Sequence, residues 1–288
     1  RSDYAQTRRR ANEAVRFAAE HGFARHPASA YPYALAGWAA YQSLDTDMAQ
    51  RCATLSAALL PRRAEPSVEL LVRSLGAVLA STHGEGPYDA LVTLRGHWTR
   101  RGQDAAVHPS LVALSSTAEV RMALRLGELA WAGEAVRRAR DQLDDSGDAL
   151  LSRAMVLAHR GCTAAARAAL EKITHGEVAS HLAASVVEAN LLFAVLAAHG
   201  REHNAAHAAV LAALDIAAGT RALRPFLDGR DSVRRLLVAS VGRFGRLDGF
   251  VEDVLTRIPV EPNAMVGALT PREHELLAEL PSMRTTDE

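Results

Sequence analysis

Glycines that end one helical segment and open the next recur in this sequence, with alanines at a constant spacing behind them. The three clearest segments begin at Gly127, Gly161 and Gly200, which are 34 and 39 residues apart. Glycine adopts the left-handed backbone that ends a helix, and small alanines let a second helix lie close against the first. A helical hairpin cannot bury its apolar face alone, so we expect the repeats to stack into a solenoid. The alanines follow the glycines by five and eight residues: Ala132 and Ala135, Ala166 and Ala169, Ala205 and Ala208.

A fourth copy lies near the start of the chain, in YPYALAGWAAYQSLDTDMAQRCATLSAALLP, with Leu44 at the turn position. A degenerate fifth copy turns near Gly84, in HGEGP. The fourth copy resembles the tetratricopeptide pattern, which has an aromatic residue, a glycine, an alanine and a proline at the positions of Tyr33, Gly37, Ala49 and Pro61. We therefore expect helix-turn-helix repeats over roughly residues 29–218.

The composition favours helices. Hydrophobic residues make up 49% of the chain and aromatic residues only 5%, and alanine dominates the apolar set. Chains rich in alanine and leucine form helices that pack closely through small residues, and no run alternates in the manner of a strand. We predict an all-α fold, a right-handed superhelix of tetratricopeptide-like hairpins, over residues 1–257.

The charge balance excludes a large nucleic-acid surface. The chain has 33 basic and 33 acidic residues, whereas a nucleic-acid-binding domain usually has a basic excess. Basic clusters at 8–10 and 95–101 are most simply solvated helix faces or ends, and a weak contact with a partner is the alternative. The longest apolar stretch, SVVEANLLFAVLAA, carries Glu188 and Asn190 and is too short to span a bilayer. No secretory signal is present, so we predict a cytoplasmic protein. Its start at Arg1 indicates an internal fragment of a larger chain.

The last 31 residues differ from the repeats. Residues 258–268, IPVEPNAMVGA, contain two prolines and a glycine without periodicity, which is typical of a linker. In LTPREHELL, Thr270 is a good N-cap, Pro271 suits the first turn and Glu273 completes a capping box. The segment at 269–288 resembles the start of a LuxR-type helix-turn-helix, with Glu288 at the beginning of its second helix. The resemblance places the recognition helix beyond Glu288, so no DNA-binding residues are expected in this chain.

The repeats together with RALRPFLDG at 221–229 resemble the repeat region of MalT-type LuxR regulators. In that family a nucleotide-binding switch domain precedes a helical-repeat sensor, and the DNA-binding domain comes last. The resemblance therefore implies that residues 1–257 are a helical-repeat sensor domain. A P-loop needs a Gly-Lys-Ser/Thr sequence, but Lys172 is the only lysine and follows Glu171. We therefore expect no nucleotide cofactor here. No group of residues offers a nucleophile, a base and oxyanion donors together, so we do not expect an enzyme.

In tetratricopeptide geometry the first helix of each pair lines the concave groove, which gives the candidate binding residues. Three aromatic side chains there would stack on a sugar ring or grip a peptide side chain. Two arginines one turn apart would hold a carboxylate or a phosphate. The alternative is that Trp38 and the tyrosines are core residues between repeats. The lining positions are Tyr31, Trp38, Tyr41, Gln42, Arg121, Arg125, Asp148, His159 and Asn190.

Two other groups of polar residues share a helix face in the sequence. His181, Ser185 and Glu188 form a polar stripe on an apolar helix, either as a buried network or as a ligand contact. His203 and His207 share a helix face but lack a neighbouring carboxylate or cysteine, so no metal site is expected.

The resemblance implies that an inducer or a protein partner in the groove favours one arrangement of the repeats and so permits oligomerisation on DNA. The alternative is a protein-protein interaction scaffold with no small-molecule ligand.

Overall fold

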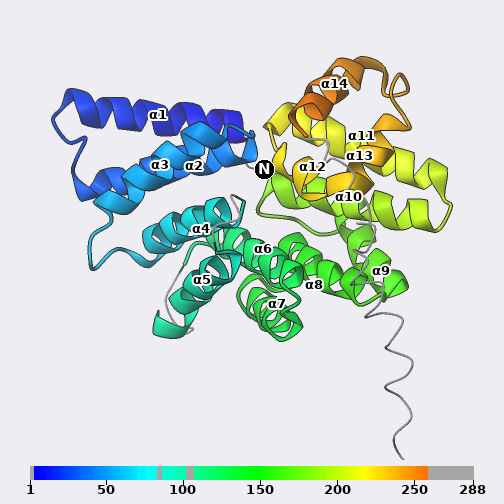
Figure 1. Cartoon of the computed structure of the whole chain (residues 1–288), viewed down its shortest axis with the longest axis horizontal. Coiled ribbons are helices and arrows are strands. Elements are labelled where there is room, and N and C mark those ends of the chain that lie inside the picture. The colour runs from blue at the N-terminus through cyan, green and yellow to red at the C-terminus, as the bar shows by residue number, and fades with distance from the viewer. Residues whose placement is uncertain (1–2, 83–85, 102–106, 259–288) are drawn as a thin grey trace, which may run out of the picture.

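The structure is a computed structural model that describes residues 3–82, 86–101 and 107–258, and every regular element among them is a helix. The predicted all-α fold class is confirmed. After α1 (Tyr4–Glu20), the helices form sequential antiparallel pairs in the manner of an α-α repeat (Figure 1). The pairs are α2 (Ala30–Gln42) with α3 (Thr46–Leu59), α4 (Pro66–Thr82) with α5 (Pro87–Arg101), α6 (Pro109–Arg125) with α7 (Leu129–Leu143), α8 (Gly147–His159) with α9 (Thr163–Thr174), and α10 (Ala183–His199) with α11 (His203–Thr220).

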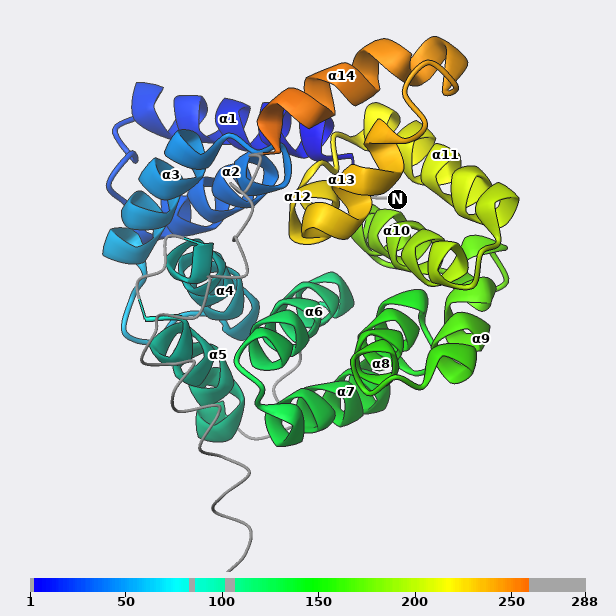
Figure 2. The same cartoon turned by 45° about the vertical axis from the view of Figure 1, so that its right-hand side comes forward.

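Three further helices follow the pairs: α12 (Arg224–Asp228), α13 (Arg230–Val238) and α14 (Asp248–Arg257). Figure 2 shows the pairs curving around a common centre, with α12 and α13 lying between α2 and α10. The C-terminal helices therefore stand where the two ends of the curved array come together. Two short 3₁₀ turns, Pro27–Ser29 and Gly245–Leu247, precede α2 and α14.

The predicted turns have one common geometry. Leu44, Gly127 and Gly161 have φ of 62°, 77° and 75°, which is the left-handed region. In each turn the next N–H donates to the carbonyl five residues back, as Asp45 does to Ala40 at 2.9 Å. This is the hydrogen bond that closes a Schellman motif and satisfies a carbonyl at the helix end.

The register predicted for the last repeat is wrong by one residue. Gly200 has φ of −77°, and Arg201 takes the left-handed conformation at 61°. Five and eight residues beyond Arg201 stand Ala206 and Ala209, and these are the buried alanines. Position relative to the left-handed residue decides which alanines face the first helix, because that residue fixes where the second helix starts.

We expect Arg201→Gly to raise the free energy of unfolding by about 0.5–1 kcal/mol. A non-glycine residue in the left-handed region costs about 1–2 kcal/mol, which exceeds the entropic cost of glycine. Arg201 is exposed, so the change removes no buried side chain. Urea unfolding followed by circular dichroism gives the number. Gly161→Arg is the matched control and should lower stability. If Arg201→Gly left stability unchanged or lowered it, Arg201 would not be strained in this turn.

The basic cluster at 95–101 is only partly a solvated surface. Arg95 donates to Glu119 of α6 at 3.1 Å and to Glu134 of α7 at 2.5 Å, and it lies 4.5 Å over the Trp131 ring. Arg138 of α7 donates to the other oxygen of Glu119. The prediction of a solvated face is therefore wrong for Arg95, which joins α5, α6 and α7 in one ion network.

The predicted linker at 258–268, apart from Ile258, and the predicted helix-turn-helix start at 269–288 lie outside the described residues. The turn near Gly84 lies outside them too, although α4 and α5 on either side form the expected antiparallel pair. None of the helices in the described part of the chain combines the length and apolar character needed to cross a membrane.

Candidate functional site

The inner side of the curved array contains a segment of the chain itself. The short helix α12 lies against α2 of the first pair and α10 of the last. The Leu223 N–H donates to the Gln42 carbonyl at 2.8 Å, and the Arg224 guanidinium lies 4.4 Å over the Tyr41 ring. Phe226 is fully buried. The concave groove predicted to bind an inducer or a partner thus contains α12, between the first and last repeats.

Three arginines surround one carboxylate at this point. Arg125 and Arg224 each donate to Asp228 Oδ1 at 3.1 Å, and Arg121 Nη1 lies 3.4 Å from Asp228 Oδ2. Arg121 also forms a two-point contact with Glu188 of α10, at 3.3 and 2.6 Å. Arg121 and Arg125 are four residues apart on α6, so they share one face of that helix and reach the same carboxylate.

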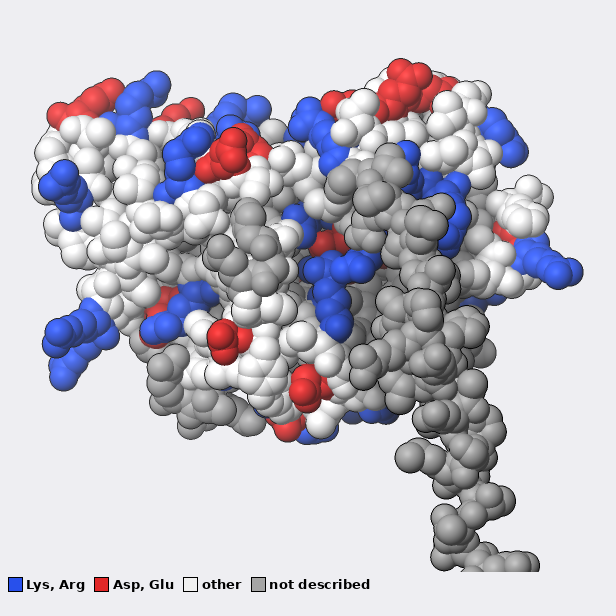
Figure 3. All heavy atoms as spheres, viewed as in Figure 1, with Lys and Arg blue, Asp and Glu red and all other residues white. Residues whose placement is uncertain are grey.

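The charges in this cluster are set by burial and by each other. Burial by itself raises the pKa of Asp228, but Arg121, Arg224 and Arg125 outweigh it and hold the pKa below its ordinary value. Burial, reinforced by Asp228, raises the pKa of Tyr41 to about 12, so the phenol is neutral at pH 7. Three arginines face two carboxylates, Glu188 and Asp228, which leaves one net positive charge. On the face shown in Figure 3, basic side chains surround acidic atoms near the middle of the molecule.

A small cavity of about 30 Å³ lies between α2, α6, α10 and α12. This is the size of one or two water molecules, so a sugar ring does not fit while α12 is in place. Four buried polar atoms of its lining residues have no hydrogen-bond partner among the described residues: Trp38 Nε1, Gln42 Oε1, Thr117 Oγ1 and Asp228 Oδ2. The side chains of α12 therefore fill this part of the groove, but they do not form hydrogen bonds with these polar atoms.

A second cavity, of about 310 Å³, adjoins the cluster on the side of α8 and α13. Its wall is mainly apolar, with Leu124, Met155 and Leu191 among the lining residues. The polar groups on it are those of His159, Glu188, Asp228 and Ser232. Small-molecule sites in proteins have about this volume and this mixture of an apolar wall with a few polar groups.

The structure brings together five of the nine residues predicted to line the groove. Trp38, Tyr41, Gln42 and Arg121 line the small cavity, and Arg125 binds Asp228 beside it. His159 lies at the second cavity. Trp38 and Tyr41 are buried core residues, as the alternative for the aromatic side chains expects, and they also line the small cavity. Whether any of these residues binds a ligand stays a prediction.

The other three predicted residues lie elsewhere. Tyr31 is 42% exposed at the start of α2. Asn190 is buried and donates to the Val186 carbonyl on its own helix at 2.9 Å. Asp148 is buried at the start of α8, where it accepts from the His181 N–H at 2.6 Å. Burial raises the pKa of Asp148. Asp148 therefore binds a backbone group just before α10, and Asn190 binds one on its own helix.

Two residues of the cluster were not predicted, Arg224 and Asp228. They stand in the RALRPFLDG segment, where a proline at the second position favours a helical turn and the spacing of four brings the two side chains together. That signal is present in the sequence. It does not say what the segment packs against, because the contact with α6 is more than a hundred residues away along the chain.

The prediction that His181, Ser185 and Glu188 share one helix is wrong for His181, which precedes α10, whereas Ser185 and Glu188 lie on it. His181 and Ser185 lie beside Asp148, whereas Glu188 faces Arg121. His207 stacks on Phe244, 5.2 Å between ring centroids, so it is not a fully solvated side chain. Within residues 3–82, 86–101 and 107–258, no three His, Cys, Asp or Glu side chains gather as metal ligands.

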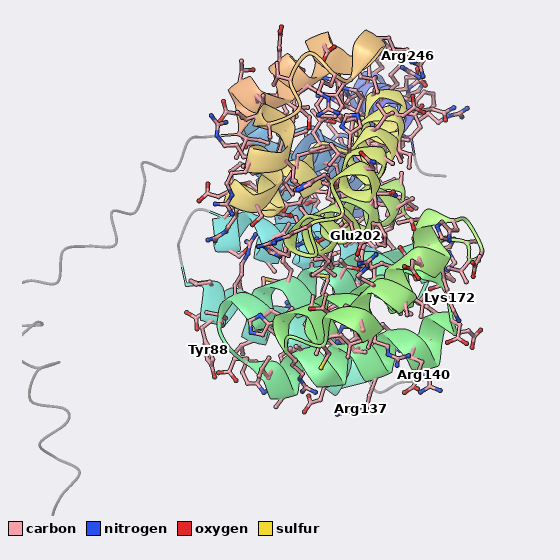
Figure 4. The ribbon with its side chains drawn as sticks, turned by 90° about the vertical axis from the view of Figure 1, so that its right-hand side faces the viewer. Tyr88, Arg137, Arg140, Lys172, Glu202 and Arg246 are labelled. Carbon is pink, nitrogen blue, oxygen red and sulfur yellow. The ribbon has the colours of Figure 1, made fainter. Side chains whose placement is uncertain are left out.

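Charged side chains on the outer helices are exposed to solvent, unlike those of the Asp228 cluster. Arg137 and Arg140 of α7 and Lys172 of α9 project away from the bundle in Figure 4. All three are exposed. The buried ionic cluster around Asp228 is therefore distinct in position and burial from the solvated charges of the convex side.

Comparison of the sequence with protein-family models finds no match, and no curated protein matches it.

Proposed function

We propose that this chain is the signal-sensing repeat domain of a LuxR-family transcriptional regulator, and that it binds a small-molecule inducer on its concave side. The observation that carries the proposal is the 310 Å³ cavity beside the Asp228 cluster. Its volume suits a small molecule, and a few polar groups stand among its mainly apolar lining residues. The LuxR assignment rests on the resemblance of residues 269–288.

The positions of α12 and α13 support a coupling between the cavity and residues 269–288. Asp228 ends α12 and lines the cavity, and Ser232 and Val233 of α13 line it too. These helices precede the segment that resembles the start of a helix-turn-helix. A ligand that contacts α12 and α13 would favour one position of these helices over another, which is the differential affinity that a population shift requires.

A thermal-shift screen tests the ligand. We expect a compound from a panel of sugars, sugar phosphates and organic acids to raise the melting temperature, since a ligand at a hundred times its Kd adds about 2.7 kcal/mol to the folded state. Met155→Trp places a larger side chain in the cavity and should abolish the shift.

Lys172→Ala, on the outer side of α9, is the matched control and should leave the shift unchanged. Circular dichroism on all variants separates loss of binding from loss of fold. A hit that is equally strong in Met155→Trp would place the ligand elsewhere and reject this cavity.

The alternative function, a protein-binding scaffold, is favoured by one observation. The groove proper holds the helix α12, as it would hold a segment of a partner protein. This alternative expects no hit in the screen. It expects instead a protein that binds the complete regulator and loses affinity when Arg125 is replaced by alanine.

A further inference from the structure

We propose that Arg121 and Arg125 form a binding site for the carboxylate of a small organic acid, and that Asp228 occupies this site as an internal substitute. The inference rests on the proposed sensor function and names the chemical class of its ligand. In the described structure the site is closed by α12. An acid whose carboxylate replaces that of Asp228 would release α12 from α6.

The arginines provide the chemistry for a carboxylate. Two guanidinium groups one turn apart on a rigid helix match the planar geometry of a carboxylate, and they already hold one. The cluster contains one more positive charge than negative charge. An incoming anion therefore meets a surplus of positive charge, whereas an incoming cation would add to it.

The internal occupant does not match the groove completely. Trp38, Gln42 and Thr117 are each more than nine-tenths buried and each has a polar atom without a hydrogen-bond partner. Asp228 Oδ2 likewise has no hydrogen bond, although Arg121 is close. Buried polar groups without partners cost stability, so a ligand that satisfies them would compete effectively with α12.

The backbone on both sides of α12 is strained. Arg221 before it has φ of 61° and Arg230 after it has φ of 47°, both in the left-handed region that non-glycine residues avoid. The contacts of α12 must outweigh this cost for the helix to remain in the groove.

The adjoining cavity indicates the size of the acid. It is continuous with the cluster through Glu188, Pro225 and Asp228, which line both cavities. An apolar body of modest size would lie against Leu124, Met155 and Leu191, with its carboxylate directed at the arginines. A small acid with an aromatic or aliphatic body fits this arrangement, and phenylacetate is a suitable probe.

The first experiment tests whether the arginines accept a carboxylate from solution. Asp228→Ala removes the internal carboxylate, and we expect acetate to raise the melting temperature of this variant by about 3 °C relative to acetamide. Acetamide has nearly the same shape without the charge, and sodium chloride matches the ionic strength. Asp253→Ala, which breaks an exposed pair with Arg257, should show no difference between acetate and acetamide.

The second experiment uses the wild-type protein and so does not depend on the folding of a variant. Hydrogen exchange of residues 222–229 is measured with phenylacetate and with phenylacetamide at the same concentration. We expect faster exchange in this segment with phenylacetate alone, because displacement of α12 exposes its amides. The helix α9 (Thr163–Thr174), which lines neither cavity, serves as an internal reference and should not change.

Rescue of Asp228→Ala by acetate together with faster exchange in the wild type supports the proposal. Absence of faster exchange with phenylacetate overturns it, even if acetate rescues the variant, since the arginines would then serve the internal carboxylate only. If a neutral compound binds in the metabolite screen and phenylacetate does not speed exchange, the ligand is not a carboxylate. The proposed sensor function would still stand. If no compound binds in the screen but both experiments here are positive, the anion site stands. The inducer is then not among the compounds of the panel.

Discussion

Replacement of Glu119 by alanine is expected to lower the free energy of unfolding by about 3–5 kcal/mol. The Glu119 side chain is 0% exposed and lies between two arginines of neighbouring helices, Arg95 and Arg138. Its removal takes from Arg138 the carboxylate that it binds, and it leaves Arg95 with the half-exposed Glu134 in place of a fully buried partner. Trp131 and Trp98, which lie 4.5 and 4.8 Å from the two guanidinium carbons, cannot supply that charge.

The loss is measured by urea unfolding followed by circular dichroism. Arg16 and Glu20 form an exposed pair at 3.8 Å, and Glu20→Ala should change stability by less than about 0.5 kcal/mol. The contrast comes from burial, because solvent screens the exposed pair and cannot reach the buried one. A loss below about 1 kcal/mol for Glu119→Ala would mean that the arginines move to solvent, and would contradict the structural role of the network.

Replacement of Asp228 by alanine is expected to cost about 3–5 kcal/mol as well. Its side chain is 4% exposed and faces Arg121, Arg125 and Arg224. Without it, three positive charges remain with Glu188 as the only carboxylate among the residues of this cluster. The effect should extend to α12, whose amides we expect to exchange faster because the helix loses its contact with α6.

The Asp228 contribution also depends on pH. Its pKa in the folded protein lies below the ordinary value of 3.8, because the arginines outweigh the effect of burial. The stabilisation is therefore complete above about pH 4 and is lost as the pH falls through the lowered pKa. Asp228→Asn should remove this part of the acid dependence, and unfolding curves between pH 2 and pH 6, about the range in which carboxyl groups titrate, would show it.

Asp253→Ala provides the matched control, since Asp253 and Arg257 form a pair of the same spacing at 3.0 Å with both side chains about 40% exposed. We expect a change below about 0.5 kcal/mol there. If both aspartates gave equally small losses, α12 would not be held by its ionic contacts, and the closure of the groove would need another explanation.

The periodic spacing of glycine and alanine was sufficient to predict the helical pairs and most of their turns. It worked because the turn geometry and the packing of the second helix are local: a left-handed residue fixes the start of the helix, and small side chains five and eight positions later face its partner. The same logic failed by one residue at Arg201, where a non-glycine residue takes the left-handed position beside Gly200. Sequence alone favours glycine there, whereas the helix end in the folded chain is set by packing.

The candidate site was predictable in part. Helical periodicity placed Arg121 and Arg125 on one face and suggested a carboxylate as their partner, and it placed Trp38, Tyr41 and Gln42 on the inner side of α2. It misplaced Asp148 and Asn190, because a shared helix face does not specify whether a polar side chain turns to the groove or to a nearby backbone group.

The sequence by itself determined the all-α repeat architecture and the two arginines, since both follow from spacing along one or two helices. Only the tertiary structure decided that the carboxylate they hold is Asp228, more than a hundred residues away, and that α12 fills the groove. The curvature accumulated over five helical pairs brings the two ends of the array together. Such a sum of small packing angles has no signature in any single segment.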